Sequence, residues 1–278
     1  MSFRSILYRR ILPDVPTEQA EAPEFFKDLN LDRVVAAVTT GKDEYDLKPF
    51  FHRPLNNADD IAYRHEVMKD LESPCVLERI SSFAENMRET RRHLKQAEKL
   101  YYRLQKNAWF LDAVAIYCDA VRQLLADLHQ TEPKSRGFRG FREYLADYVK
   151  SESFNNLAAD TAKLEADLRS VKYCAIIRGT GVTVRGYRAE TDYSMEIEQT
   201  FAKFRQGSVK NYRVKFSDPP EMNHLEAQIL DQVVKLHPEI FSCFEEYCSK
   251  YRGFADAVVK RFDREIQFYV CYFVISTT

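Results

Sequence analysis

The sequence predicts a mainly α-helical, elongated, multi-helix protein that carries one small inserted α/β module. Glycine and proline are scarce, with 8 and 10 among 278 residues, which disfavours turn-rich β folds. Apolar residues recur at helical spacing over most of the chain and alternate only between about residues 172 and 216. With 45% hydrophobic and 30% charged residues, the chain has the composition of a folded protein with a sizeable core.

Residues 1–45 are predicted to form an irregular N-terminal arm. Pro13, Pro16 and Pro23 interrupt any longer element there, because proline lacks a backbone donor and clashes with the preceding helical turn. Helical spacing in this region is confined to the stretch from Leu31 to Thr39. We therefore expect one short helix near the end of the arm.

Local signals mark the start of the next two helices. Asn57 is a suitable N-cap, and Asp59 and Asp60 follow in the first turn, where the helix dipole favours negative charge. Another helix is expected after Ser73, with Pro74 at its first position, where a missing N–H costs little. The two helices are thus predicted to follow one another directly.

The second of these helices is predicted to be long. Its apolar residues keep helical spacing from Leu77 to Gln105 and are interrupted once, at Arg91. A continuous helix over this range spans ~43 Å, which is why we expect an elongated molecule. Further helices are expected at about 108–129, 137–150, 153–169 and 221–249, the last with a kink or break at Pro238, and from Phe254 to about Val274.

The middle of the chain changes from helical to alternating periodicity. Two alternating runs, Tyr173–Arg178 and Val182–Arg188, flank the turn Gly179–Gly181, which is typical of a β-hairpin. A helix at about 193–205 and a third strand from Asn211 to Phe216 are expected to complete the module. The predicted segments are the arm (1–45), a helical core with outgoing helices (46–171), the α/β insert (172–216) and returning helices (217–278).

No constellation for catalysis is recognisable. The sequence has no GxxxxGK[ST] phosphate loop, no GxSxG nucleophile motif and no HExxH or CxxC metal signature. Its six histidines and six cysteines are scattered, and we expect the cysteines to be buried free thiols. The prediction is a non-enzyme with no catalytic residues, no metal and no cofactor.

Charge and hydropathy restrict the possible partners. No apolar run reaches transmembrane length and residues 1–13 lack a signal-type apolar core, which predicts a cytoplasmic protein without a membrane partner. The formal net charge is -1, so an electrostatic partner has to be met by a local patch.

The α/β insert is such a patch. Nine basic residues outnumber four acidic ones in it, a local net charge of +5. The basic residues, our candidate DNA-binding residues, are Lys172, Arg178, Arg185, Arg188, Lys203, Arg205, Lys210, Arg213 and Lys215. Positive charge near Tyr173, Tyr187 and Tyr212 suits contact with phosphates, which requires no sequence readout. The alternative is an ordinary basic surface, since strand alternation places Arg185 and Arg188 on opposite faces.

Two other basic segments are interpreted as structural. The first alternates with acidic residues, as a solvated helix face does; it comprises Arg88, Arg91, Arg92, His93, Lys95, Lys99, Arg103 and Lys106. The second, residues 134–142, superficially resembles an RG-type segment. Because Phe138, Phe141 and Leu145 lie at helical spacing there, core packing is expected instead.

One stretch resembles a known family. Residues 54–71, PLNNADDIAYRHEVMKDL, are similar to the PL-x5-I-x2-R-x2-V-x3-L signature in the core domain of the MutS family. The segments Phe25–Asp32 and Phe262–Tyr269 also look like MutS-related ATPases of a divergent branch. The resemblance covers most of the chain from about residue 25.

The resemblance implies a lever of long helices that carries a clamp, and the clamp would be the insert at 172–216. It further implies contact between the clamp and the DNA backbone, and a lever joined to a dimerising ATPase. The family's Walker motifs and mismatch-reading domain are missing here, so the chain is expected to be a fragment or truncation of a longer protein. ATP and Mg²⁺ are expected only for that absent domain.

Two functions are therefore predicted as alternatives. The first is a non-catalytic lever and clamp segment of a MutS-like repair or recombination ATPase, homodimeric at full length, that binds duplex or branched DNA through phosphates. The second is a helical scaffold that binds protein, with the β-insert as a docking edge and no DNA affinity.

Overall fold

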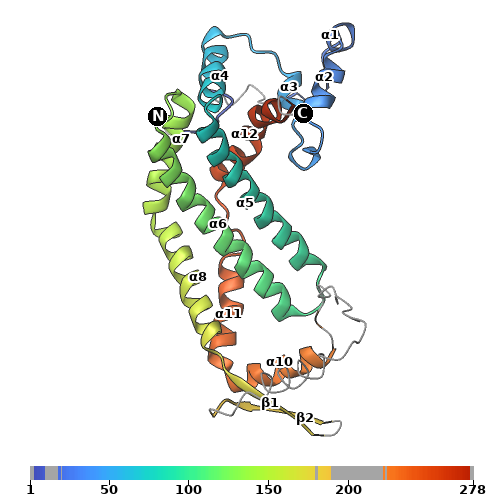
Figure 1. The fold of residues 1–278 in the computed structure, drawn as a ribbon, viewed down its shortest axis with the longest axis vertical. Coiled ribbons are helices and arrows are strands. Elements are labelled where there is room, and N and C mark those ends of the chain that lie inside the picture. Colours follow the sequence, from blue (N-terminus) through green and yellow to red (C-terminus); the bar gives the residue numbers. More distant parts are fainter. Residues whose placement is uncertain are drawn as a thin grey trace, which may run out of the picture. The chain divides into compact units, whose positions relative to one another are not determined.

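The computed structural model describes residues 3–9, 18–19, 21–178, 181–188, 222 and 224–275 (Figure 1). These residues are mainly helical, with one two-stranded antiparallel sheet, which confirms the predicted fold class. The helices are α1 (Phe25–Asp28), α2 (Leu31–Val38), the 3-10 turn η1 (Asp43–Tyr45), α3 (Lys48–His52), α4 (Ala58–Leu71), α5 (Pro74–Lys99), α6 (Arg103–Thr131), α7 (Arg136–Lys150), α8 (Glu152–Ser170), α10 (His224–Leu236), α11 (Pro238–Lys250) and α12 (Ala257–Ile275). None of these helices is long and apolar enough to cross a lipid bilayer.

The chain forms two compact units. Unit 1 comprises Met1–Leu94, Leu111–Ala159 and Tyr251–Thr278, and unit 2 comprises Lys95–Phe110 and Asp160–Lys250. Helices α5, α6 and α8 contribute residues to both units. This partition differs from the four segments predicted along the chain, whose roles stay predictions.

Local sequence signals set most helix boundaries. The Asn57 side chain accepts a hydrogen bond from the Asp59 backbone N–H at 2.9 Å, so the predicted N-cap of α4 is confirmed. Pro74 and Pro238 are the first residues of α5 and α11, where proline fits without breaking a helical hydrogen bond.

The predicted continuous helix from Leu77 to Gln105 is wrong. Helix α5 ends at Lys99 and α6 begins at Arg103, with Leu100 buried and Tyr101 83% exposed in the turn between them. The turn contains neither glycine nor proline, and the apolar spacing continues on both sides of it. Periodicity alone therefore could not reveal the break.

Aromatic packing forms the core of unit 1. The rings of Phe141 and Phe262 stack with their centroids 3.6 Å apart, and Phe138 and Leu145 are fully buried beside them. This confirms that the basic segment at 134–142 serves core packing. Burial of these side chains supplies the main stabilisation of the unit.

The cysteines are free thiols, but the prediction that all are buried is wrong. Cys118 and Cys271 are buried, whereas Cys75 and Cys243 are exposed on α5 and α11. Helical spacing marked the apolar stretches correctly, but it did not resolve which side of the helix each cysteine occupies.

Apart from the exposed Arg4, residues 3–8 of the predicted arm are buried in unit 1 without forming a helix or strand. Because this segment makes no helical or strand hydrogen bonds, side chains of α4 and α12 donate to the backbone carbonyls of residues 5–7. Ser5 O accepts from Tyr63 Oη at 2.8 Å, Ile6 O from Tyr269 Oη at 2.9 Å, and Leu7 O from Arg64 Nε at 3.1 Å. Gly137 of α7 allows this close approach, because a Cβ there would lie 2.8 Å from Ile6 Cδ1.

The Glu265 carboxylate anchors the same segment. Its Oε2 accepts hydrogen bonds from Ser5 Oγ at 2.8 Å and from the Ile6 backbone N–H at 2.9 Å. Burial raises the pKa of Glu265 to about 7, and the bonds from Ser5 and Ile6 only partly oppose this. Between its ordinary value of 4.5 and about 7, the folded chain thus holds a proton that the unfolded chain has released.

We expect Glu265 to make unit 1 less stable as the pH rises through that window. From about pH 5 to about pH 7.5 the loss in free energy of unfolding is about 2–3 kcal/mol. Glu265→Gln keeps an oxygen acceptor for Ser5 and Ile6 but does not titrate, so its stability should fall less. Urea unfolding of both proteins at several pH values measures the difference, and parallel pH profiles would refute the assignment.

Candidate nucleic-acid interface

The predicted hairpin is present in unit 2. Strands β1 (Tyr173–Arg178) and β2 (Gly181–Gly186) pair antiparallel, in a register that runs from Tyr173 opposite Gly186 to Arg178 opposite Gly181 (Figure 1). Gly179 and Thr180 of the predicted turn lie outside the described residues. The alternating pattern therefore located β1 and the body of β2, although β2 ends at Gly186 and not at the predicted Arg188.

Three of the candidate DNA-binding residues have side chains that the structure places, and all three are exposed. They are Lys172, Arg185 and Arg188. Arg178 is the last residue of β1, but the structure does not describe its side chain. The other five candidates lie outside the described residues: Lys203, Arg205, Lys210, Arg213 and Lys215. The predicted helix at 193–205 and the predicted third strand also lie outside them.

The strand register decides how the described positive charges are presented. Arg185 lies opposite Cys174, and alternation puts it on the same face of β2 as Thr183. Arg188 follows two residues after Gly186, where β2 ends, so it is not fixed by the ladder. The charges are therefore not all gathered on one flat face.

Two exposed tyrosines accompany these charges. The side chains of Tyr173 and Tyr187 are 46% and 48% exposed, one at the start of β1 and the other just after β2. An exposed tyrosine offers both a hydroxyl donor for a phosphate oxygen and a ring face for a sugar or base. The open end of the hairpin thus combines positive charge with aromatic surface.

A helical frame supports the hairpin within unit 2. β2 contacts α10, which buries Ala227 and Val233. Farther along, the buried Thr161 and Tyr247 hydroxyls hydrogen-bond at 2.6 Å and so link α8 to α11. The exposed charges are therefore attached to packed helices rather than to an isolated ribbon.

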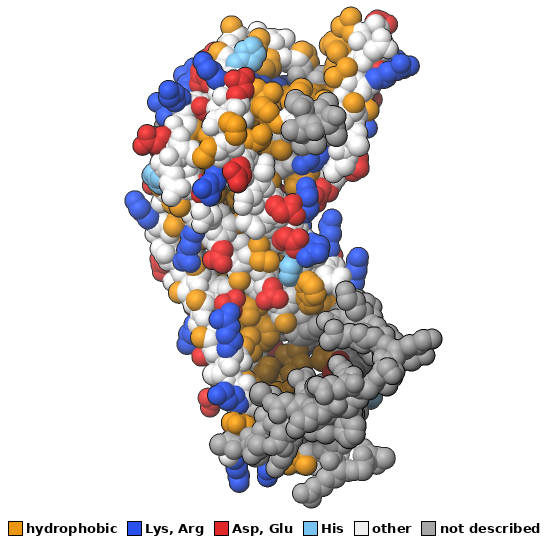
Figure 2. All heavy atoms as spheres, in the orientation of Figure 1, with side chains coloured by type: hydrophobic (Ala, Val, Ile, Leu, Met, Phe, Trp, Pro, Cys, Tyr) orange, Lys and Arg blue, Asp and Glu red, His pale blue; other side chains and the backbone are white. Residues whose placement is uncertain are grey.

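The second basic run does not behave as one solvated face. Figure 2 shows Lys and Arg side chains interspersed with Asp and Glu along α5. Arg88 donates to Glu85 at 2.9 Å, and Arg92 lies 2.6 Å from Glu89, as expected for helix-surface pairs. These pairs neutralise the first part of the run.

Arg91 is the exception to the predicted solvated face. It forms an ion pair with Asp263 of α12, whose side chain is only 3% exposed, and it donates to Tyr45 Oη at 2.6 Å. Its place on the apolar side of α5 is explained by this buried partner. The interruption of the apolar pattern at Arg91 thus marks a structural ion pair.

The second part of the run differs from the first. Among the residues that the structure describes, no ion pair is formed by Lys95, Lys99 or Lys106. Arg103 pairs with Glu245 of α11 but keeps 73% of its side chain exposed. Net positive charge therefore remains where α5 ends and α6 begins.

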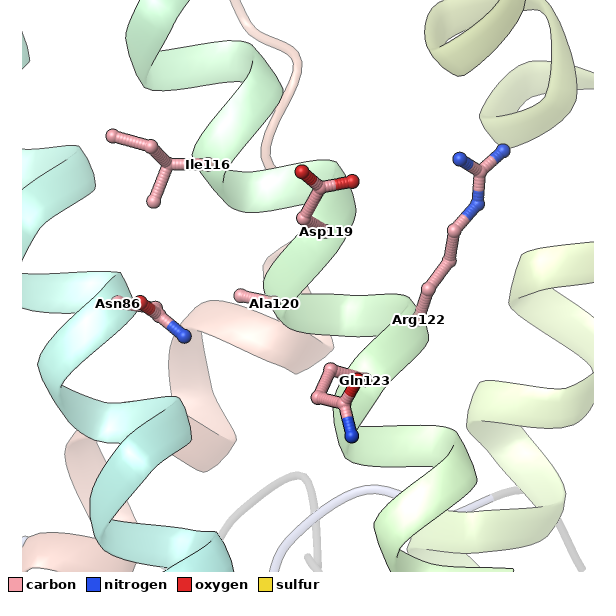
Figure 3. A pocket seen from close by; sticks show the side chains of 6 residues that line it. All are labelled: Asn86, Ile116, Asp119, Ala120, Arg122 and Gln123. Atoms are coloured by element: carbon pink, nitrogen blue, oxygen red, sulfur yellow. The ribbon is translucent and has the colours of Figure 1, made fainter.

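A pocket of about 570 Å³ lies between α5 and α6 in unit 1 (Figure 3). It is lined by Asn86, Ile116, Asp119, Ala120, Arg122 and Gln123. Gln123 donates to Asp127 at 3.0 Å, and the Arg122 guanidinium lies 5.6 Å from the Phe154 ring centroid, so both have structural partners. The lining holds no thiol, hydroxyl or imidazole, and its carboxylate, Asp119, is exposed.

Sequence reasoning did not identify the buried carboxylates of α12. Asp263 and Glu265 meet partners on distant segments, and among the described residues no cluster of His, Cys, Asp and Glu could hold a metal ion. The available signal was the presence of two acids in Phe262–Tyr269, a stretch whose Phe262, Ile266, Phe268 and Tyr269 are apolar. No protein-family model, curated protein or solved structure matches the chain.

Proposed function

We propose that this chain is a non-catalytic DNA-contacting module, in which the hairpin binds backbone phosphates and the helices connect it to the rest of a MutS-like repair or recombination ATPase. The ATPase partner, homodimer formation and a cytoplasmic location belong to the same proposal. The first two rest on the resemblance of residues 54–71 to the family signature.

One observation carries the proposal. The basic residues of the insert whose side chains are described, Lys172, Arg185 and Arg188, are all exposed, with Tyr173 and Tyr187 beside them. The insert has a local net charge of +5 in a chain whose total is -1. A charged and aromatic surface of this kind suits a polyanion read by its backbone.

Binding to two duplexes of unrelated sequence tests this function. If the hairpin contacts phosphates only, both duplexes should bind with dissociation constants that agree within about twofold. Fluorescence anisotropy of labelled DNA titrated with the full chain gives both values. Absence of binding at about 50 mM salt, or a strong preference for one sequence, would exclude the proposal.

The alternative, a protein-binding scaffold, is favoured by a different surface. Phe25, Leu29 and Val34 are exposed on and between α1 and α2. Exposed apolar side chains in one small region are typical of protein–protein contacts. A protein-binding scaffold should have no affinity for DNA. Its affinity for a protein partner should change little with salt concentration.

A further inference from the structure

The turn between α5 and α6, residues 100–102 in unit 2, exposes an aromatic side chain to solvent. Tyr101 is 83% exposed, more than any other large apolar or aromatic side chain in the described part of the chain. Its ring meets that of Tyr102 edge-on, with the centroids 5.3 Å apart. One face of Tyr101 is therefore left open to solvent.

Basic residues flank Tyr101 in the sequence. Residues 95–106 contain four basic residues and one acidic residue, a local net charge of +3. Lys95 and Lys99 are exposed, and neither forms an ion pair within the described ranges. Arg103 keeps 73% of its side chain exposed despite its pair with Glu245.

This arrangement contrasts with the rest of α5. Arg88, Arg91 and Arg92 are each matched by a carboxylate, so their charges hold the fold together or are neutralised. Around Tyr101, the ring meets Tyr102 edge-on and Arg103 pairs with Glu245, but Lys95 and Lys99 form no ion pair among the described residues. An open aromatic face bordered by unneutralised lysines suits unpaired bases, which stack on such rings while their phosphates meet the charges.

We infer that the α5–α6 turn is a binding site for unpaired bases of DNA, with Tyr101 as the stacking platform and Lys99 and Arg103 as phosphate contacts. This inference deepens the proposed function and rests on it for the choice of DNA. It names the substrate class: duplex DNA that carries a single-stranded arm, as at a fork or branch. Turn and hairpin both belong to unit 2.

The substitution Tyr101→Ala tests the inference. We expect it to weaken binding of forked DNA about tenfold, the effect of losing one base–aromatic stack, and to leave binding of the fully paired duplex unchanged. Tyr101→Phe should bind as the unaltered chain does, because it keeps the ring. The side chain is so exposed that all three proteins should melt at the same temperature.

A single-stranded oligonucleotide, titrated in the same way, separates this inference from the proposed function. If the chain binds the oligonucleotide through Tyr101 but does not bind duplex, the hairpin proposal fails and the turn assignment stands. If duplex binding is present but Tyr101→Ala changes neither forked nor single-stranded binding, the turn assignment fails alone. An equal loss on duplex and forked DNA would also overturn it.

Discussion

Arg91→Met is expected to destabilise unit 1 by about 3–5 kcal/mol, because it leaves the Asp263 carboxylate buried without its counter-ion. The Asp263 side chain is 3% exposed, and its second oxygen, Oδ1, has no hydrogen-bond partner in the described part of the chain. The variant also removes the hydrogen bond from Arg91 to Tyr45. Urea unfolding measures the loss as a lower midpoint.

The loss of stability caused by Arg91→Met should increase as the pH rises. Burial raises the pKa of Asp263 to about 6 even though Arg91 opposes the shift. Without Arg91 the pKa of Asp263 rises further. In the unfolded chain this carboxyl titrates near its ordinary value of 3.8, so the folded variant keeps the proton to a much higher pH than the unfolded chain does. Stability then falls over a wider range as pH rises, and the loss is larger near pH 8 than near pH 5.

Two controls make this prediction specific. Arg92→Met removes a neighbouring arginine that is 68% exposed and pairs with Glu89 on the surface, so it should cost less than about 1 kcal/mol. Combining Arg91→Met with Asp263→Asn removes both charges and should recover part of the loss. Equal destabilisation by Arg91→Met and Arg92→Met would show that the buried pair is not important.

Reversing the two hairpin arginines, Arg185→Glu with Arg188→Glu, is expected to weaken duplex binding by a factor on the order of 100 at about 0.1 M salt. Two lost phosphate contacts account for this factor through counterion release, before any repulsion is added. Both side chains are exposed, so the thermal midpoint should not change. Anisotropy titrations with labelled duplex give the affinities.

The matched control reverses two lysines outside the hairpin. Lys150 ends α7 and Lys163 lies on α8, and both are exposed. Changing both to glutamate alters the net charge of the chain by the same amount as the hairpin variant. If the control loses as much affinity, the binding reflects total charge and the hairpin is not the contact.

The helices and the hairpin could be predicted because their signals are local. Asn57, Pro74 and Pro238 act within one helical turn, and strand alternation located the hairpin between Tyr173 and Arg188. The α5–α6 turn was missed because no residue in it disfavours a helix. Its conformation is linked to the burial of Leu100, which depends on tertiary packing.

The partners of buried charges could not be predicted in the same way. Arg91 and Asp263 lie 172 residues apart, and Glu265 lies 260 residues from Ser5. No periodicity in the sequence connects such positions, so Arg91 looked like part of a solvated face. The candidate interface was predictable as a cluster of charge, but its exposure required the structure.

The salt dependence of duplex binding tests the central claim, contact between the hairpin and backbone phosphates, most directly. For the unaltered chain, the logarithm of the association constant should fall with the logarithm of salt concentration with a slope of about -3 or steeper, since at least Lys172, Arg185 and Arg188 are exposed for contact. Arg185→Gln with Arg188→Gln should make the slope shallower by about 2. A slope near zero, or the same slope in both proteins, would contradict the account.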